Sequence, residues 1–133
     1  MVRFPDEEEL RIWVKELELS GLRDALPDID DEWYRQMLSS YQLTAMRPDC
    51  LGNLCLSGAV VFHRITKNHY RVDGNKRSAV ISTFLLFNVN GSHLNVSWKD
   101  LYAISKEVAR SKKTPEVVVG AIHAVFSVAC RKR

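Results

Sequence analysis

The side chains best suited to chemistry gather in one short stretch, His69-Tyr-Arg-Val-Asp-Gly-Asn-Lys-Arg77. It places an imidazole, a carboxylate, an amide and cationic groups within nine residues, and an apolar run from Ser78 to Val89 follows it. A helix that begins here would offer unpaired N–H groups and a positive dipole end to an anion such as phosphate. A base beside a phosphate-binding turn is the outline of a phosphoryl- or nucleotidyl-transfer site.

His69 is the candidate general base, because an ordinary imidazole pKa of about 6.5 suits proton removal from a hydroxyl near neutral pH. The alternative is a histidine that only closes the preceding helix through the helix dipole. Asp73 is the candidate Mg²⁺ ligand, since hard cations prefer carboxylate oxygen. Asp73 is equally suited to a turn or a helix cap, and these roles are compatible with metal binding.

The next four residues are candidates for phosphate or nucleotide binding: Gly74, Asn75, Lys76 and Arg77. A glycine permits a positive φ or close approach of a phosphate to the backbone, although it also suits a plain turn. Cations are unfavourable at a helix N-terminus, and a bound anion would resolve that conflict. Arg77 can hold two phosphate oxygens in its fork, whereas Lys76 acts as a point charge. The alternative is a pair of exposed basic side chains lying over apolar surface.

Written as H-x-x-x-D-G-N-K-R, the stretch from His69 to Arg77 resembles the signature motif of the Fic/Doc family, and Doc (death-on-curing) toxins most closely. The similarity continues through the following helix, and a weaker one covers Met46-Arg47-Pro48 and Leu51 to Asn68. Family nucleotidyltransferases usually have Gly where this chain has Lys76. They also carry a second Arg where this chain has Val80.

The resemblance implies a toxin of a toxin–antitoxin system that inhibits translation. Such a toxin is a kinase that transfers the γ-phosphate of ATP, with Mg²⁺, to a hydroxyl of a translation-machinery protein, in the family elongation factor Tu. It implies His69 as base, Asp73 as metal ligand and residues 74–77 as the phosphate site. Some relatives carry an inhibitory helix with Glu before Gly or Asn, a pair that this chain lacks. We therefore expect the antitoxin, a separate protein, to cover the active-site groove.

Two other functions stay open. The first is protein adenylyl transfer with ATP bound in the opposite sense, where Lys76 would crowd the usual nucleotide position. The second is a catalytically inactive interaction or regulatory module. The inactive module is favoured by Arg71, because the family places a buried Phe there and a guanidinium cannot replace that ring without a large cost. We expect Arg71 to impair the activity.

Composition indicates a soluble, cytoplasmic protein. The chain has 133 residues, 46% of them apolar and 26% charged, with a net charge of +3, which suits one domain over residues 1–133. Basic residues are scattered apart from Arg131-Lys132-Arg133, so we expect no direct binding of nucleic acid. Acidic residues follow Met1-Val-Arg-Phe-Pro, and no apolar run is long enough to span a membrane. Three cysteines form no disulfide framework.

The apolar periodicity is helical almost throughout and predicts an all-α, compact single-domain bundle around a central buried helix. The predicted helices cover residues 6–20, 31–42, 51–68, 75–90, 97 to about 112, and 115 onward. Residues 43–50 contain Pro48 and are the candidate for a short flap hairpin, which the family resemblance suggests near this place. Residues 92–96 are predicted to be a loop.

Overall fold

The computed structural model describes residues 1–21, 26–68 and 74–133. Its elements follow in the order α1 (Glu7–Leu19), α2 (Asp31–Ala45), α3 (Leu54–Thr66), α4 (Gly74–Val89), β1 (Ser92–Leu94), α5 (Trp98–Arg110), α6 (Pro115–Ala129) and β2 (Cys130–Lys132). Helices dominate, and the two strands have three residues each. The predicted all-α fold is therefore confirmed.

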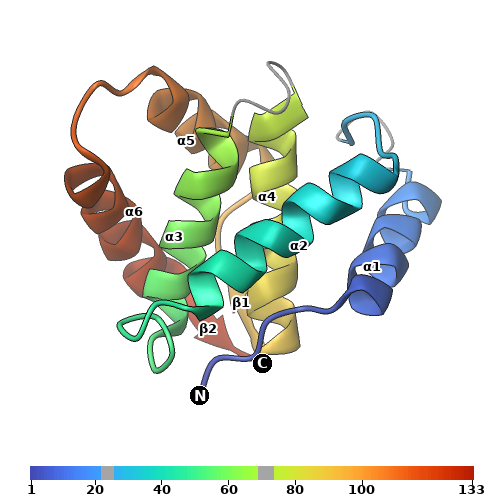
Figure 1. Ribbon diagram of the computed structural model, residues 1–133, viewed down its shortest axis with the longest axis horizontal. Helices are drawn as coiled ribbons and strands as arrows, with labels where there is room; N and C mark the ends of the chain where they lie inside the picture. The colour runs from blue at the N-terminus through green and yellow to red at the C-terminus, as the bar shows by residue number, and fades with distance from the viewer. Residues whose placement is uncertain (22–25, 69–73) are drawn as a thin grey trace.

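α3 and α4 lie side by side at the centre of the molecule. In Figure 1, α2 crosses in front of them, α6 lies to the left of α3 and α1 lies on the right. The end of α3 and the start of α4 lie at the same end of the molecule (Figure 1). α4 is the predicted central helix, because buried side chains occur on every face of it. Both helices meet at the segment that carries the predicted motif.

Local sequence signals explain where several helices begin. The Asp6 carboxylate accepts a hydrogen bond from the backbone N–H of Glu9, and the Glu9 carboxylate accepts one from the backbone N–H of Asp6, so a capping box starts α1. Ser97 caps α5 through the backbone N–H of Asp100. Pro115 occupies the first turn of α6, where its missing N–H costs nothing. These predicted starts are confirmed to within a residue or two.

The predicted flap hairpin over residues 43–50 is wrong. α2 continues to Ala45, and turns follow it up to Cys50. The side chain of Thr44 is buried and bonds back to the Ser40 carbonyl, so this residue extends the helix instead of leaving it. The predicted loop after Gly91 is also wrong in part, because β1 pairs antiparallel with β2, with Ser92 opposite Lys132.

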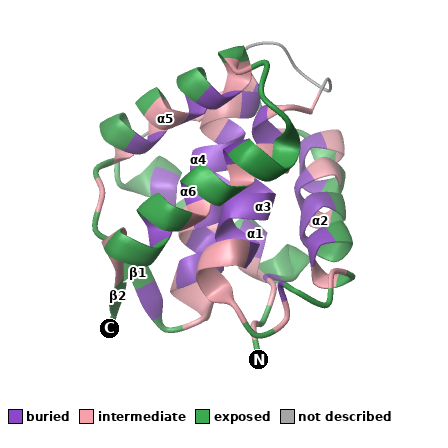
Figure 2. Cartoon of the chain, turned by 90° about the vertical axis from the view of Figure 1, so that its left-hand side faces the viewer, coloured by how far each residue is buried: buried purple, intermediate pink, exposed green. Residues whose placement is uncertain are grey.

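Figure 2 shows that the buried residues concentrate on α3, on α4 and on the inward sides of the surrounding helices. Close approach of α3 and α4 depends on Gly58, since a Cβ there would lie 2.5 Å from a ring carbon of Phe87. Phe87 is fully buried and packs edge-on against Phe126 of α6. Through Gly58 and Phe126, the Phe87 ring of α4 thus contacts both α3 and α6.

Candidate functional site

The structure describes only part of the predicted site. His69, Arg71 and Asp73, the predicted base, motif departure and metal ligand, lie outside the described residues. Gly74, the first residue of α4, opens the described part of the site, so the predicted phosphate-binding residues form the first turn of a 16-residue helix. The predicted helix over residues 75–90 is confirmed, and it begins one residue earlier than predicted, at Gly74.

The residues on either side of the motif segment are joined directly. Asn75 is almost fully buried, at 5% exposure, and its side-chain amide donates to the backbone carbonyl of Asn68. The Asn68 amide in turn donates to the side-chain oxygen of Gln36 at 3.2 Å, and Gln36 donates to Glu32 at 2.9 Å. This chain of amides ties the end of α3 and the start of α4 to α2. The predicted contact of Asn75 with phosphate stays a prediction.

A second link holds the first turn of α4 from the other side. The indole N–H of Trp33, a fully buried residue of α2, donates to the Ser78 hydroxyl at 2.8 Å. Ser78 donates to the Gly74 carbonyl at 2.7 Å. Trp33 was not among the site residues that the sequence predicted. The role of Trp33 in positioning this turn depends on its contact with Ser78, which lies 45 positions further along the chain.

Lys76 and Arg77 are both half-buried, but they face different surroundings. Successive residues of an α-helix differ in direction by about 100°. Lys76 faces α5 and lines a pocket there, whereas Arg77 is not among the residues that line it. The two predicted phosphate ligands therefore do not serve one common cavity on the α5 side.

The pocket has a volume of about 430 Å³ and lies between the first turn of α4 and the C-terminal half of α5. Its lining, here called the α4–α5 basic pocket, consists of Lys76, Tyr102, Lys106, Ala109 and Arg110. The size falls within the range of roughly 300–1,000 Å³ that is usual for small-ligand sites. The lining is polar and cationic, so the pocket suits an anionic ligand better than an apolar one.

A third cation nearby already has a structural role. The Lys67 ammonium group donates to the carbonyls of Ala109 and Ser111, at 3.2 and 2.7 Å. These carbonyls belong to the end of α5, where the helix dipole is negative and a cation is favourable. Lys67 thus links the end of α3 to the end of α5 and helps to fix the helix that lines the basic pocket.

His63 lies one turn before Lys67 on α3 and is half-buried. Burial lowers the pKa of His63 below its ordinary value, and the positive charges of Lys67 and Arg64 lower it further. A neutral imidazole is therefore favoured at neutral pH. No catalytic role was predicted for His63, and its surroundings are those of a boundary residue in a basic region.

Mg²⁺ is the metal that the motif implies. Within residues 1–21, 26–68 and 74–133, no three His, Cys, Asp or Glu side chains come close enough together to hold a metal ion. The predicted ligand Asp73 is not among these residues, and the described part of the site supplies cations and amides around Lys76. The metal prediction stays a prediction.

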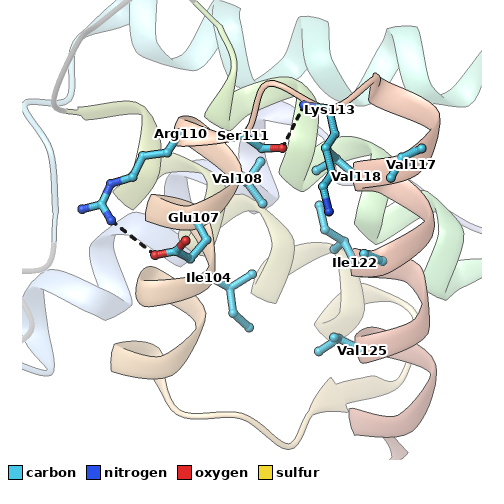
Figure 3. Close-up of a pocket in the computed structure, with 11 residues that line it drawn as sticks. Ile104, Glu107, Val108, Arg110, Ser111, Lys113, Val117, Val118, Ile122 and Val125 are labelled. Atoms are coloured by element: carbon cyan, nitrogen blue, oxygen red, sulfur yellow. Dashed lines mark hydrogen bonds and ion pairs between the residues drawn. The ribbon is translucent and has the colours of Figure 1, made fainter.

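A second groove, of about 490 Å³, lies between α5 and α6 (Figure 3). Its floor is apolar, with Ile104 and Val108 on α5 facing Val118 and Ile122 on α6. Polar groups lie at one end, where Arg110 pairs with Glu107 and the Lys113 backbone bonds to Ser111 (Figure 3). The apolar floor carries no acid–base group, so this groove is not the candidate chemical site.

Comparison of the chain with family models, with curated proteins and with solved structures found no match. Among the described parts of the chain, no helix combines the length and the hydrophobicity needed to cross a lipid bilayer. The motif and the geometry of the described residues around it therefore remain the features that point to a function.

Proposed function

We propose that the chain is a Doc-like toxin, a kinase that transfers the γ-phosphate of ATP to a hydroxyl of a translation-machinery protein, with elongation factor Tu as the first candidate. The observation that carries the proposal is the continuous pattern from His69 to Arg77, with lysine rather than glycine at position 76. The start of α4 at Gly74, within the motif, supports it, because a helix N-terminus suits a phosphate.

In the proposed reaction, His69 accepts the proton of the substrate hydroxyl as its oxygen attacks the γ-phosphorus. The new P–O bond forms while the bond between the γ-phosphorus and the bridging oxygen breaks, and ADP leaves with that electron pair. Arg77 and the backbone N–H groups at the start of α4 are proposed to stabilise the negative charge on the transferred phosphoryl group. Lys76 is proposed to bind the nucleotide phosphates on the side of α4 that faces α5.

Mg²⁺ in such a reaction would neutralise charge on the phosphates. Asp73 is its proposed ligand, because a carboxylate next to the phosphate-binding turn has the ligand chemistry that Mg²⁺ requires. We assign no step to the metal, since the described residues add no carboxylate cluster beside it. ATP is the proposed co-substrate, and an antitoxin on a separate chain is the proposed inhibitor.

Arg71 favours a second candidate, an inactive module that binds a partner or regulates without catalysis. A guanidinium in place of a buried ring weakens the anchoring of the motif segment, because an unpaired charge is costly in an apolar environment. Protein adenylyl transfer is the third candidate, and it requires ATP in the opposite sense. Lys76 opposes that candidate, because the family resemblance implies that this long side chain would crowd the usual nucleotide position.

The test uses three versions of the full chain: wild type, His69→Ala and His93→Ala. His93 is an exposed residue of β1, so its substitution is a matched loss of one imidazole away from the site. Each protein is produced in growing bacteria, and each is also incubated with ATP, Mg²⁺ and purified elongation factor Tu. Growth and the intact mass of the factor are then measured.

Wild type and His93→Ala should arrest growth and add one phosphate to the factor, whereas His69→Ala should do neither. Addition of AMP in place of phosphate would show that the chain is an adenylyltransferase and not a kinase. If wild type modifies no protein and His69→Ala affects growth as wild type does, the inactive module is the correct assignment.

A further inference from the structure

We propose that the α4–α5 basic pocket binds the polyphosphate chain of a nucleotide, with Lys106 and Arg110 of α5 acting together with Lys76. The inference rests on the proposed function only in choosing a nucleotide as the source of the polyphosphate. Its two α5 residues lie outside the motif and were assigned no role from the sequence. They would act as binding residues that determine affinity for the phosphates.

The pocket side of α5 is built by regular spacing. Tyr102, Lys106 and Arg110 follow each other at intervals of four residues, so they lie on one face of the helix. This face meets Lys76 from α4 across the pocket. Two helices thus contribute cations to one cavity, an arrangement that a solvated basic stripe on a single helix does not produce.

Among the residues that the structure describes, few carboxylates compensate the charges of this pocket. Among the described residues, neither Lys76 nor Lys106 has a carboxylate in an ion pair, and Arg110 pairs only with Glu107 at 3.3 Å. The Arg110 and Glu107 side chains are 73% and 76% exposed, so water screens that pair and it contributes little. Lys76 also stands at the positive end of the α4 dipole. An anion in the pocket would compensate the charges of Lys76, Lys106 and Arg110, and it would also interact favourably with the positive end of the α4 dipole.

Two contacts hold the cationic groups in place before a ligand arrives. The Lys106 ammonium group lies 4.8 Å from the centre of the Tyr102 ring, a cation–π contact that limits its side-chain freedom. Lys67 fixes the end of α5 through the Ala109 and Ser111 carbonyls. Groups that are ordered in advance lose less entropy on binding, so they bind a ligand more tightly.

The chemistry of the three side chains points to phosphate. A guanidinium offers paired N–H donors that match two phosphate oxygens, and ammonium groups act as compact charges beside them. A polyphosphate brings several negative charges within the length of one small pocket, whereas an acidic peptide spreads them along an extended chain. The volume of about 430 Å³ suits the smaller ligand. Binding here would place the remaining phosphates beside the α4 turn that holds the transferred one.

The test measures equilibrium binding of inorganic tripolyphosphate, ATP and adenosine to the full chain by calorimetry, at about 150 mM salt so that weak surface binding is screened. The variant is Lys106→Gln with Arg110→Gln. The matched control is Lys99→Gln, which removes a charge from the exposed first turn of the same helix. Circular dichroism checks that all three proteins are folded.

Wild type and Lys99→Gln should bind tripolyphosphate and ATP, with adenosine much weaker, and the double variant should raise both dissociation constants by roughly tenfold or more. Equal dissociation constants for the double variant and Lys99→Gln, or no binding of tripolyphosphate to wild type, would overturn the inference. A third outcome would also overturn the inference: wild type binds a poly-glutamate peptide but not tripolyphosphate, and the double variant no longer binds the peptide.

These outcomes are independent of phosphoryl transfer. If the chain phosphorylates no protein but binds tripolyphosphate through Lys106 and Arg110, the pocket inference stands and the kinase proposal fails. If elongation factor Tu is phosphorylated with the same KM for ATP by wild type and the double variant, the kinase proposal stands and the pocket inference fails.

Discussion

The side-chain amide of Asn75 donates a hydrogen bond to the backbone carbonyl of Asn68, and so joins the first turn of α4 to the residue that follows α3. The two residues flank the segment 69–73 that carries the proposed base and metal ligand. Asn75 is buried, and Asn68 is further tied to α2 through Gln36. Part of the motif thus serves to hold its own ends together.

Asn75→Ala should lower the free energy of unfolding by about 1–3 kcal/mol, because a partly buried carbonyl loses its donor. Asn90→Ala is the matched control. It removes hydrogen bonds to Arg3 and Leu86 at the far end of the same helix. Chemical denaturation measures both losses. If the motif acts as proposed, phosphoryl transfer should fall in Asn75→Ala and persist in Asn90→Ala. Equal activities at equal stability would mean that the Asn75 link is only structural.

Ser78→Ala should destabilise the fold by about 1–3 kcal/mol, since it leaves the indole N–H of the buried Trp33 without an acceptor. Trp33 fluorescence should change as well, because the indole loses a polar neighbour. Thermal unfolding and emission spectra measure the two effects.

Ser82→Ala provides a control one turn further along α4. The Ser82 hydroxyl is buried and, within the part of the chain that the structure describes, has no hydrogen-bond partner. Removing it should be neutral or stabilising, because a buried unpaired polar group is lost. A Ser78→Ala protein as stable as Ser82→Ala would contradict the role given to the Trp33 contact.

The sequence predicted those parts of the fold that local signals determine. The helix starts near residues 6, 97 and 115 were predicted, and each depends on residues within one turn of each other. The capping box between Asp6 and Glu9 was not predicted and is seen in the structure. β1 and β2 were missed for the opposite reason. Each has three residues, too few to show alternation, and their pairing joins Ser92 to Lys132 at the end of the chain.

The candidate site likewise has a part that the sequence predicted and a part that it did not. The motif predicted a helix start at residue 75, and α4 begins at Gly74; phosphate binding by this turn stays a prediction. The partners of Asn75 and Ser78 could not be predicted, because periodicity says that a side chain points inward and not which atom it meets. The spacing of Tyr102, Lys106 and Arg110 was visible in the sequence. Its meaning depends on the packing of α5 against α4, which the spacing alone does not determine.

Gly58→Ala should destabilise the fold by about 1–3 kcal/mol, because the new methyl group would lie 2.5 Å from a carbon of the buried Phe87 ring. That ring cannot move freely, since it packs edge-on against Phe126. Gly120→Ala is the control: nothing lies within 4 Å of the added group on α6, so stability should rise by about 0.5–1 kcal/mol. Denaturation midpoints compare the two. Adding Phe87→Leu to Gly58→Ala should recover part of the loss.

The lowered pKa of His63 predicts a loss of stability in acid. The unfolded chain takes up a proton on this residue near its ordinary pKa of about 6.5, whereas the folded chain resists protonation to a lower pH. Protonation therefore favours unfolding as the pH falls below about 6.5. His63→Gln should flatten the stability profile between pH 7 and the acid side, measured by urea denaturation at each pH.

His93→Gln is the control for this profile. It removes an exposed histidine from β1 and keeps His63 in place, so the acid-side loss of stability should persist. A His63→Gln profile that runs parallel to the profile of His93→Gln would show that the acid sensitivity comes from other groups.

Arg71→Phe is the substitution that decides how far the motif is impaired. If Arg71 weakens the hold on His69, as the resemblance implies, an apolar ring should restore the anchor and raise the rate of phosphoryl transfer to elongation factor Tu. Arg71→Gln is the matched control, since it removes the charge without supplying a ring. The rate at saturating ATP is measured for all three proteins. A higher rate in Arg71→Phe but not in Arg71→Gln would support anchoring of His69 by the ring. A higher rate in both variants would show that the charge of Arg71 causes the impairment. Equal rates throughout would contradict any impairment by Arg71.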